Sequence, residues 1–290
     1  METLPSSKPD KVTARSEQAV HTSGFMAESL ASRKFGKALG RMYLGFVYAF
    51  FYVPLLVVFV YSFNSSKYTT AWNGFSLRWY ETLFKNKAIL DAALNSLMVA
   101  ITAATIATIL GTLAALAIKR YRFFGRKTLY VGILLLTVSP DIVMGISFLI
   151  LFIACNLELG FWSLLIAHTA LCAPFVALTV YARLDEFDEH LIEAARDLGA
   201  SETKALLKIL LPLATPALAA GWLLSFTLSM DDVLISAFVT GPGYEVLPVR
   251  IYSMVKLGVK PDVNALSAIM FAMTLVLVVA AQSLTRVRRK

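Results

Sequence analysis

The chain has 290 residues, of which 58% are hydrophobic and only 16% are charged, and its mean hydropathy is +0.68. Soluble domains carry about 25% charged residues and could not bury so much apolar sequence, so a soluble globular protein is excluded. The net charge of +8 would also suit a nucleic-acid-binding protein, but the sequence contains no basic stretch with aromatic residues arranged for base stacking.

The first 42 residues are mostly polar, rich in Ser, Lys, Pro and Thr, and without periodicity. A cleavable signal peptide would place a short apolar region near residue 1, which this sequence does not do. We therefore predict that residues 1–42 form a tail that is partly disordered and ends in a short basic helix at the membrane surface.

Six apolar stretches are long enough to cross a bilayer, which takes about 20 residues of helix. They cover residues 43–63, 93–118, 128–153, 161–181, 213–238 and 263–285. The second stretch is rich in Ala, Thr, Ser and Gly, a composition that favours close packing between helices over lipid contact. The predicted fold is an all-α membrane domain with six transmembrane helices over residues 43–285, followed by a basic tail at 286–290.

Basic residues alternate between the two sides of this predicted membrane domain. Of the 27 Lys and Arg residues, 20 fall in the two termini and the loops on their side, and 7 fall in the other loops. Five of the 20 lie within the nine residues 119–127. By the positive-inside rule, both termini and the loops at 119–127 and 182–212 are cytoplasmic.

The loop over residues 183–212 is too polar to span a membrane and too regular for a linker. Phe187, Leu191, Ala194 and Leu198 recur at helical spacing and predict one face of an amphipathic helix. Gly199 can end that helix as a left-handed cap, and a Ser at position 201 can begin the next one. Periodicity alone is equally compatible with a surface helical hairpin that has no partner.

Three carboxylates fall inside the predicted spans, and no Lys or Arg lies well inside any of them. Asp141 is in the third span, and Asp231 and Asp232 are in the fifth. Because a charge at the bilayer centre costs about 2.5–3.5 kcal/mol, we expect these acids to face a water-filled path and to receive a cation from outside. Alternatively they are structural, as an Asp can cap a broken helix at Pro140–Asp141. Asp231 and Asp232 point about 100° apart on a helix, so one could face the path while the other bonds a Ser or Thr.

Other polar residues in the spans favour no chemistry of their own. His168, in the fourth span, has no second candidate ligand nearby and is interpreted as a packed or hydrogen-bonded helix residue. Cys155 and Cys172 are interpreted as small buried hydrophobic residues, without a disulfide or a metal. No phosphate-binding G-x-x-x-x-G-K-[ST] loop is present, so the chain is not expected to hydrolyse ATP.

The segment EAARDLGASETKALLKILLP, residues 193–212, resembles the cytoplasmic signature of the permeases of binding-protein-dependent ABC importers. The residues that match the signature are Glu193, Ala194, Ala195, Gly199, Leu211 and Pro212. The segments SPDIVMGIS (139–147) and LSMDDVLIS (228–236), and the similarity over about residues 40–285, are most like the spermidine/putrescine permeases within that family.

This resemblance implies a MetI-like permease fold in the bacterial inner membrane. It also implies partners: a second homologous permease, two ATPase subunits that bind ATP and Mg, and a periplasmic polyamine-binding protein, with nucleic acid not among them. The signature residues would then couple the permease to the ATPase, and this chain would hold no cofactor or metal and catalyse no reaction.

For a polyamine substrate, the expected path residues are Asp141, Asp231 and Asp232, with the aromatic faces of Tyr52 and Trp79 along the methylene stem. Aromatic residues also gather at membrane interfaces, so an interfacial position is the alternative interpretation of Tyr52 and Trp79. A permease of the same fold for another cationic or small organic solute is the alternative function. A secondary carrier would need internal repeats, and a membrane-embedded enzyme would need a catalytic constellation; neither is evident in the sequence.

Overall fold

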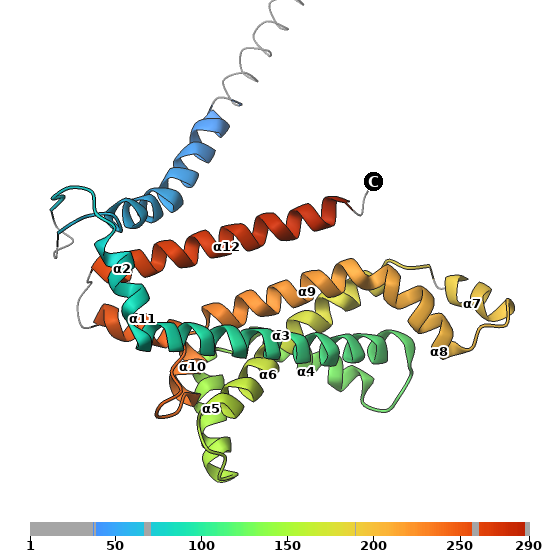
Figure 1. The fold of residues 1–290 in the computed structure, drawn as a ribbon. Helices are drawn as coiled ribbons and strands as arrows, with labels where there is room; N and C mark the ends of the chain where they lie inside the picture. The colour runs from blue at the N-terminus through green and yellow to red at the C-terminus, as the bar shows by residue number, and fades with distance from the viewer. Residues whose placement is uncertain (1–36, 38, 67–70, 189, 257–260, 288–290) are drawn as a thin grey trace, which may run out of the picture. The chain divides into compact units, whose positions relative to one another are not determined.

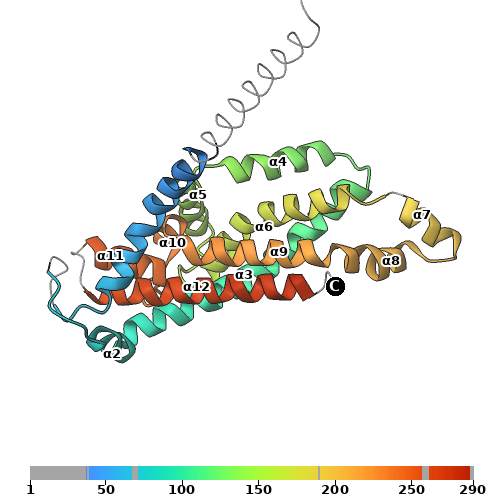
Figure 2. The ribbon, with the colours of Figure 1, turned by 90° about the horizontal axis from the view of Figure 1, so that it is seen from above.

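A computed structural model of the chain describes residues 37, 39–66, 71–188, 190–256 and 261–287. This part of the chain is helical, with isolated β-bridges and no β-strand. After a first helix, Leu39–Tyr61, the elements are α2 (Arg78–Lys85), α3 (Lys87–Arg120), α4 (Arg126–Val138), α5 (Asp141–Ala154), α6 (Phe161–Asp185), α7 (His190–Asp197), α8 (Glu202–Ala205), the π-helical turn η1 (Leu206–Leu210), α9 (Leu211–Asp231), α10 (Leu234–Val239), α11 (Leu247–Lys256) and α12 (Pro261–Val287) (Figures 1 and 2).

The chain divides into a unit that ends at Val60 and a unit that runs from Tyr61 to Lys290. In the first unit, the side chains of the helix that begins at Leu39 are almost all exposed, as expected of a helix whose neighbours are lipid or other subunits. The tail predicted over residues 1–42, with its basic surface helix, lies almost wholly outside the described residues. The end of the basic C-terminal tail, residues 288–290, also lies outside them.

Four of the predicted spans are matched by continuous helices that are long and apolar enough to cross a membrane. They are Leu39–Tyr61, Lys87–Arg120, Phe161–Asp185 and Glu202–Asp231. The sixth predicted span corresponds to α12, which extends it by two residues at each end. The number of helices long and apolar enough to cross a membrane rises from four to five when the bent pair α4 and α5 is counted as one span. The number of six transmembrane helices therefore stays a prediction.

The third predicted span is not one straight helix. α4 and α5 meet at Ser139–Pro140 with a bend of 111°. Proline has no N–H to continue the backbone ladder, and its ring restricts the preceding residue to an extended conformation, here ψ 135° at Ser139. Each piece is only about 20 Å long at 1.5 Å per residue, so neither could cross the hydrocarbon core alone.

The core of the second unit is formed by α3, α6 and α9 packed side by side (Figures 1 and 2). The reason is the run of small residues that the composition of the second span predicted. A Cβ atom on Gly111 of α3 would lie only 2.7 Å from the carbonyl oxygen of Ala173 in α6, and one on Gly221 of α9 would lie 3.2 Å from a methyl of Val176. The prediction of close helix packing by this span is therefore confirmed.

The two ends of α3 hold different loops. Near its N-terminus, the Ser96 hydroxyl accepts a hydrogen bond from the backbone N–H of Leu247 (2.7 Å), and the Asn95 amide donates to the Glu245 carbonyl (3.1 Å). At its C-terminus, Lys119 and Arg120 contact the coupling loop described below. Ser96 and Arg120 are about 36 Å apart along the helix, somewhat more than the roughly 30 Å hydrocarbon core. The second unit therefore has two ends separated by about a membrane thickness.

Candidate substrate path and coupling loop

The fifth predicted span ends earlier than expected, because the helix is interrupted at Asp232. α9 ends at Asp231, Asp232 is extended (φ −69°, ψ 118°), and α10 begins at Leu234. The Asp232 carboxylate accepts hydrogen bonds from the backbone N–H of Ile235 (3.2 Å) and of Ser236 (2.7 Å), and from the Ser236 hydroxyl (2.9 Å). Asp232 therefore caps the start of α10 with a side chain that is only 7% exposed.

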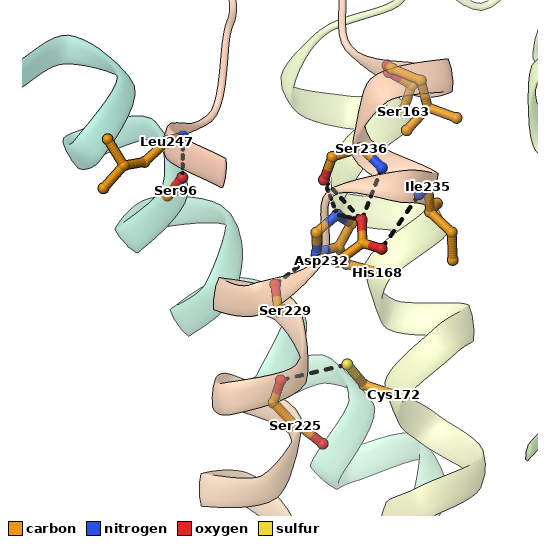
Figure 3. Close-up of polar contacts among 11 residues, drawn as sticks. Ser96, Ser163, His168, Cys172, Ser225, Ser229, Asp232, Ile235, Ser236 and Leu247 are labelled. Atoms are coloured by element: carbon orange, nitrogen blue, oxygen red, sulfur yellow. Dashed lines mark hydrogen bonds and ion pairs between the residues drawn. The ribbon is translucent and has the colours of Figure 1, made fainter. Parts of the chain in front are cut away.

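His168 of α6 lies against this interruption (Figure 3). It is 1% exposed, and its Nδ1 and Nε2 atoms lie 2.6 Å and 2.9 Å from the hydroxyl oxygens of Ser229 and Ser236. Its Nε2 is also 3.5 Å from the Asp232 carboxylate. The prediction that His168 is a hydrogen-bonded helix residue is confirmed. That His168 lies beside one of the three acids, Asp232, was not predicted from the sequence.

Sequence reasoning missed this cluster because its members are 61 to 68 residues apart in the chain. No local pattern pairs a histidine in one span with two serines in another. The only available signal was the presence of Ser229 and Ser236 on either side of the two aspartates, which gains meaning only when α6 is placed next to them.

The other two acids are placed differently from Asp232. Asp231 is exposed at the C-terminal end of α9, and Asp141 is exposed at the first position of α5. Within the described residues neither carboxylate has a hydrogen bond or an ion pair. The structure thus separates the three acids into one that is engaged within the chain and two that are open to a ligand or a partner.

Both open acids lie at helix interruptions, and the helices that follow the two interruptions pack together. α5 contacts α10, and a Cβ on Gly145 of α5 would lie 2.6 Å from the ring of Phe238 in α10. Glycine at this position therefore permits the close approach of the two short helices.

The two aromatic candidates have different surroundings. Tyr52 lies in the first unit with 52% of its surface exposed. Trp79, on α2, is partly buried against a hydrophobic cluster that includes Leu83 and Leu247, and its indole N–H donates to the Asn64 carbonyl oxygen (2.7 Å). The Trp79 ring therefore has a clear structural function within the second unit, whatever else it contacts.

The predicted coupling loop is a helix, a tight turn and a second helix. Gly199 has φ +83° after α7, the Ala200 N–H donates to the Ala195 carbonyl (3.0 Å), and the Gly199 N–H donates to the Arg196 carbonyl (2.9 Å). This pair of bonds is the Schellman arrangement, so the predicted left-handed cap is confirmed. Ser201 accepts a hydrogen bond from the Lys204 N–H (3.4 Å), which confirms it as the N-cap of α8.

The predicted apolar face of this helix is wrong in detail. Leu198 is 89% exposed and Ala194 is exposed, whereas Ala195 is 7% exposed and belongs to the hydrophobic cluster that includes Leu184 and Leu210. Phe187 precedes α7 and packs against the same cluster from outside the helix. The true contact position is one residue away, since α7 starts only at His190 and periodicity cannot fix the rotation of so short a helix.

The last two signature residues begin α9 and directly follow a distorted stretch of helix. The Leu211 N–H donates to the Leu206 carbonyl, five residues back, which makes the π-helical turn η1 directly before Pro212. Proline lacks the N–H that would continue the ordinary ladder, and π-turns of this kind absorb such a defect without ending the helix. Pro212 itself is exposed.

Ion pairs attach the coupling loop to the basic loop at 119–127. Lys119 contacts Asp185 (2.7 Å) and Arg120 contacts Glu202 (3.3 Å). A cavity of about 450 Å³ lies between the loops, and Arg122, Arg126 and Arg196 are among its lining residues. Two loops predicted to share one side of the membrane therefore do lie at the same end of α3.

The two cysteines are not alike. Cys172 is fully buried and contacts the Ser225 carbonyl oxygen (3.4 Å), but Cys155 is exposed at the end of α5, so its predicted burial is wrong. Cys155 follows a helix that presents most of its side chains outward, which its apolar sequence did not reveal. Among the described residues, no group of three His, Cys, Asp or Glu side chains could hold a metal ion.

Comparison with known proteins shows which family has this architecture. Residues 107–289 match the family described as the inner membrane component of binding-protein-dependent transport systems. The chain is 51% identical over 255 residues to the spermidine/putrescine transport system permease protein PotC of Escherichia coli strain K12, covering 88% of this chain and 97% of PotC. It is 43% identical over 234 residues to the putrescine transport system permease protein PotI of the same strain, covering 78% of this chain and 82% of PotI.

Among solved structures, the fold is similar to that of a bacterial ABC transporter involved in the import of the acidic polysaccharide alginate. The TM-score is 0.68 at 18% sequence identity, and the match covers 88% of this chain and 96% of the other. At this identity the likeness concerns the fold alone. The helical architecture, the multi-pass apolar sequence and the family match agree, and the chain belongs to the family of inner membrane components of binding-protein-dependent ABC transport systems.

Proposed function

We propose that the chain is a permease subunit of an ATP-driven importer of spermidine and putrescine. The observation that carries this proposal is the 51% identity to a spermidine/putrescine permease over 97% of that protein's length. The 43% identity to a putrescine permease supports the same substrate class and leaves the preference between the two polyamines open.

The acids at the two helix interruptions suit a polyamine. Asp141 and Asp231 are exposed and have no partner among the described residues, so each can accept charge-assisted hydrogen bonds from a substrate ammonium. Asp232 is engaged as a helix cap, and we therefore assign it a supporting rather than a direct role. Tyr52 and Trp79 stay candidates for contact with the methylene stem through their ring faces.

We assign ATP hydrolysis to partner subunits and transmission to the coupling loop. Glu193 and Ala194 lie on the exposed part of α7, and Ala195 anchors that helix to the core through its buried side chain. Gly199 fixes the turn, and Leu211 and Pro212 begin α9, which leads to Asp231. A movement of α7 can thus reach the acid through one continuous helical segment, Glu202–Asp231.

The assembly we propose contains a second homologous permease, two ATPase subunits that bind ATP and Mg, and a periplasmic polyamine-binding protein. Both termini and the coupling loop are cytoplasmic, and the chain itself holds no cofactor. The basic loop at 119–127 supports this orientation, because it is tied to the coupling loop by Lys119–Asp185 and Arg120–Glu202.

The test is transport by the purified complex in proteoliposomes, with ATP on the side of the coupling loop and the binding protein on the other side. Spermidine, putrescine, a basic amino acid and an anionic solute are compared for uptake and for stimulation of ATP hydrolysis. We expect both polyamines to be imported and to stimulate hydrolysis. Stimulation by the amino acid without a response to either polyamine would favour the alternative, a permease of the same fold for another cation.

A further inference from the structure

The interruption between α9 and α10 is unusual because no helix-breaking residue causes it. The residues from Ser229 to Ser236 include neither proline nor glycine, the usual causes of a broken helix. A chain of this composition would otherwise continue as a helix, since that keeps its backbone hydrogen bonds satisfied in an apolar environment. Side chains must therefore hold the interruption in place.

The contacts of His168 meet this requirement from both sides. Ser229 belongs to the last turn of α9 and Ser236 to the first turn of α10, and one imidazole ring on α6 contacts both (Figure 3). His168 and Ser236 are at most 1% exposed and Ser229 is 5% exposed, so water does not compete for these bonds. The ring therefore fixes the distance between the two helix ends.

The directions of the hydrogen bonds follow from the number of protons available. The Ser236 hydroxyl has one proton, which it donates to the Asp232 carboxylate (2.9 Å). Its oxygen must then accept from Nε2–H of His168, and Nδ1, without a proton in neutral imidazole, accepts from the Ser229 hydroxyl. Donation therefore runs in one direction, from Ser229 through His168 and Ser236 to Asp232, and every member of the chain is satisfied by the neutral ring.

We propose that His168 is a positioning residue for Asp231: by holding Ser229 and Ser236 on either side of the interruption, it keeps the α9 helix ending at Asp231 and keeps that carboxylate exposed. Asp231 has no partner of its own among the described residues, so the backbone beneath it determines where its side chain lies. This inference rests on the proposed function, in which Asp231 contacts the substrate.

The experiment is a double-mutant cycle in the full transporter, with Asp231→Asn and His168→Leu made singly and together. Uptake of radiolabelled spermidine per complex and ATP hydrolysis per complex are measured in proteoliposomes. Loss of a charge-assisted contact predicts a fall in uptake of about ten- to hundred-fold for Asp231→Asn. His168→Leu should lower uptake by a similar factor while ATP hydrolysis continues, so that fewer substrates are imported per ATP. The double variant should be no worse than either single one, because both act on the same contact.

A control variant and two milder variants separate positioning from general damage. Cys172→Ala lies one turn along α6 and removes a buried contact with α9 at Ser225, so it disturbs the same helix pair away from the interruption and should leave uptake per ATP unchanged. Ser229→Ala and His168→Gln each remove one part of the bridge and should give smaller losses of the same kind. If His168→Leu fails to assemble, these two variants decide the matter by the same criteria.

The outcomes distinguish this inference from the proposed function. The positioning role would be overturned if the two losses of uptake multiply in the double variant. It would also be overturned if His168→Leu lowers uptake and ATP hydrolysis by the same factor, as in Cys172→Ala. An impaired Asp231→Asn complex alongside unimpaired His168 and Ser229 variants would overturn it and leave the acidic path standing. If Asp231→Asn itself transports like the unaltered complex, the acidic path fails and the positioning role fails with it.

Discussion

Replacing Asp232 by Asn should destabilise the complex without a specific effect on the substrate. Replacing Asp231 by Asn should instead impair transport of the substrate without destabilising the complex. The Asp232 carboxylate accepts three hydrogen bonds at 2.7–3.2 Å from Ile235 and Ser236, and its side chain is 7% exposed. An amide has one oxygen, and its NH₂ group would face a donor, so at least one bond to a charged acceptor is lost. Such a bond contributes about 1.5–3 kcal/mol when the remaining partner is buried.

The assay is the thermal midpoint of the detergent-solubilised complex, followed as the fraction that still elutes as an intact complex after heating. Asp232→Asn should lower this midpoint by several degrees, and Asp231→Asn should leave it unchanged because Asp231 is exposed and has no partner among the described residues. In proteoliposomes loaded with equal amounts of folded complex, Asp232→Asn should lose less uptake than Asp231→Asn. An unchanged midpoint for Asp232→Asn together with a large loss of uptake per folded complex would refute the assignment of Asp232 as a cap.

Further predictions concern the coupling loop, the core and the topology. Gly199→Val should uncouple ATP hydrolysis from uptake or prevent ATPase binding, because φ is +83° and a β-branched residue is strained there by about 1–2 kcal/mol or more. Gly199→Asn should retain coupling, because Asn tolerates this conformation. Equal behaviour of the two variants would contradict the reasoning. Gly111→Ala should reduce the yield of folded protein because its Cβ would meet the Ala173 carbonyl oxygen at 2.7 Å, whereas Gly132→Ala, with no atom within 4 Å, should not; comparable yields would show that α3 and α6 can separate freely. In a chain without Cys155 and Cys172, single cysteines replacing Thr70, Glu158 or Glu245 should react with an impermeant thiol reagent from outside, and those replacing Gly125 or His190 should not; the opposite labelling would reverse the orientation.

Much of this protein is determined locally and could therefore be predicted from its sequence. The apolar stretches correspond to helices because a run of about 20 apolar residues has to satisfy its backbone internally. The turn of the coupling loop was predictable for a similar reason: Gly199 adopts a left-handed conformation that other residues rarely adopt, and Ser201 caps the helix that follows it. Close packing of α3 followed from its small residues, since small side chains permit the approach of neighbouring backbones.

Rotations and partners across the chain were decided only by the tertiary structure. Periodicity placed Leu198 on the buried face of α7, but the core contacts Ala195, because the short helix is rotated by where its flanking segments dock. The break at Pro140 was visible in the sequence, whereas its 111° angle depends on how α5 packs against α10. The interruption at Asp232 has no proline or glycine to mark it in the sequence, and locally only the Asp232 cap supports it. His168, more than sixty residues away, contacts Ser229 and Ser236 on either side of it only because α6 lies beside α9, and a hydrogen bond between distant segments has no signature in either segment alone.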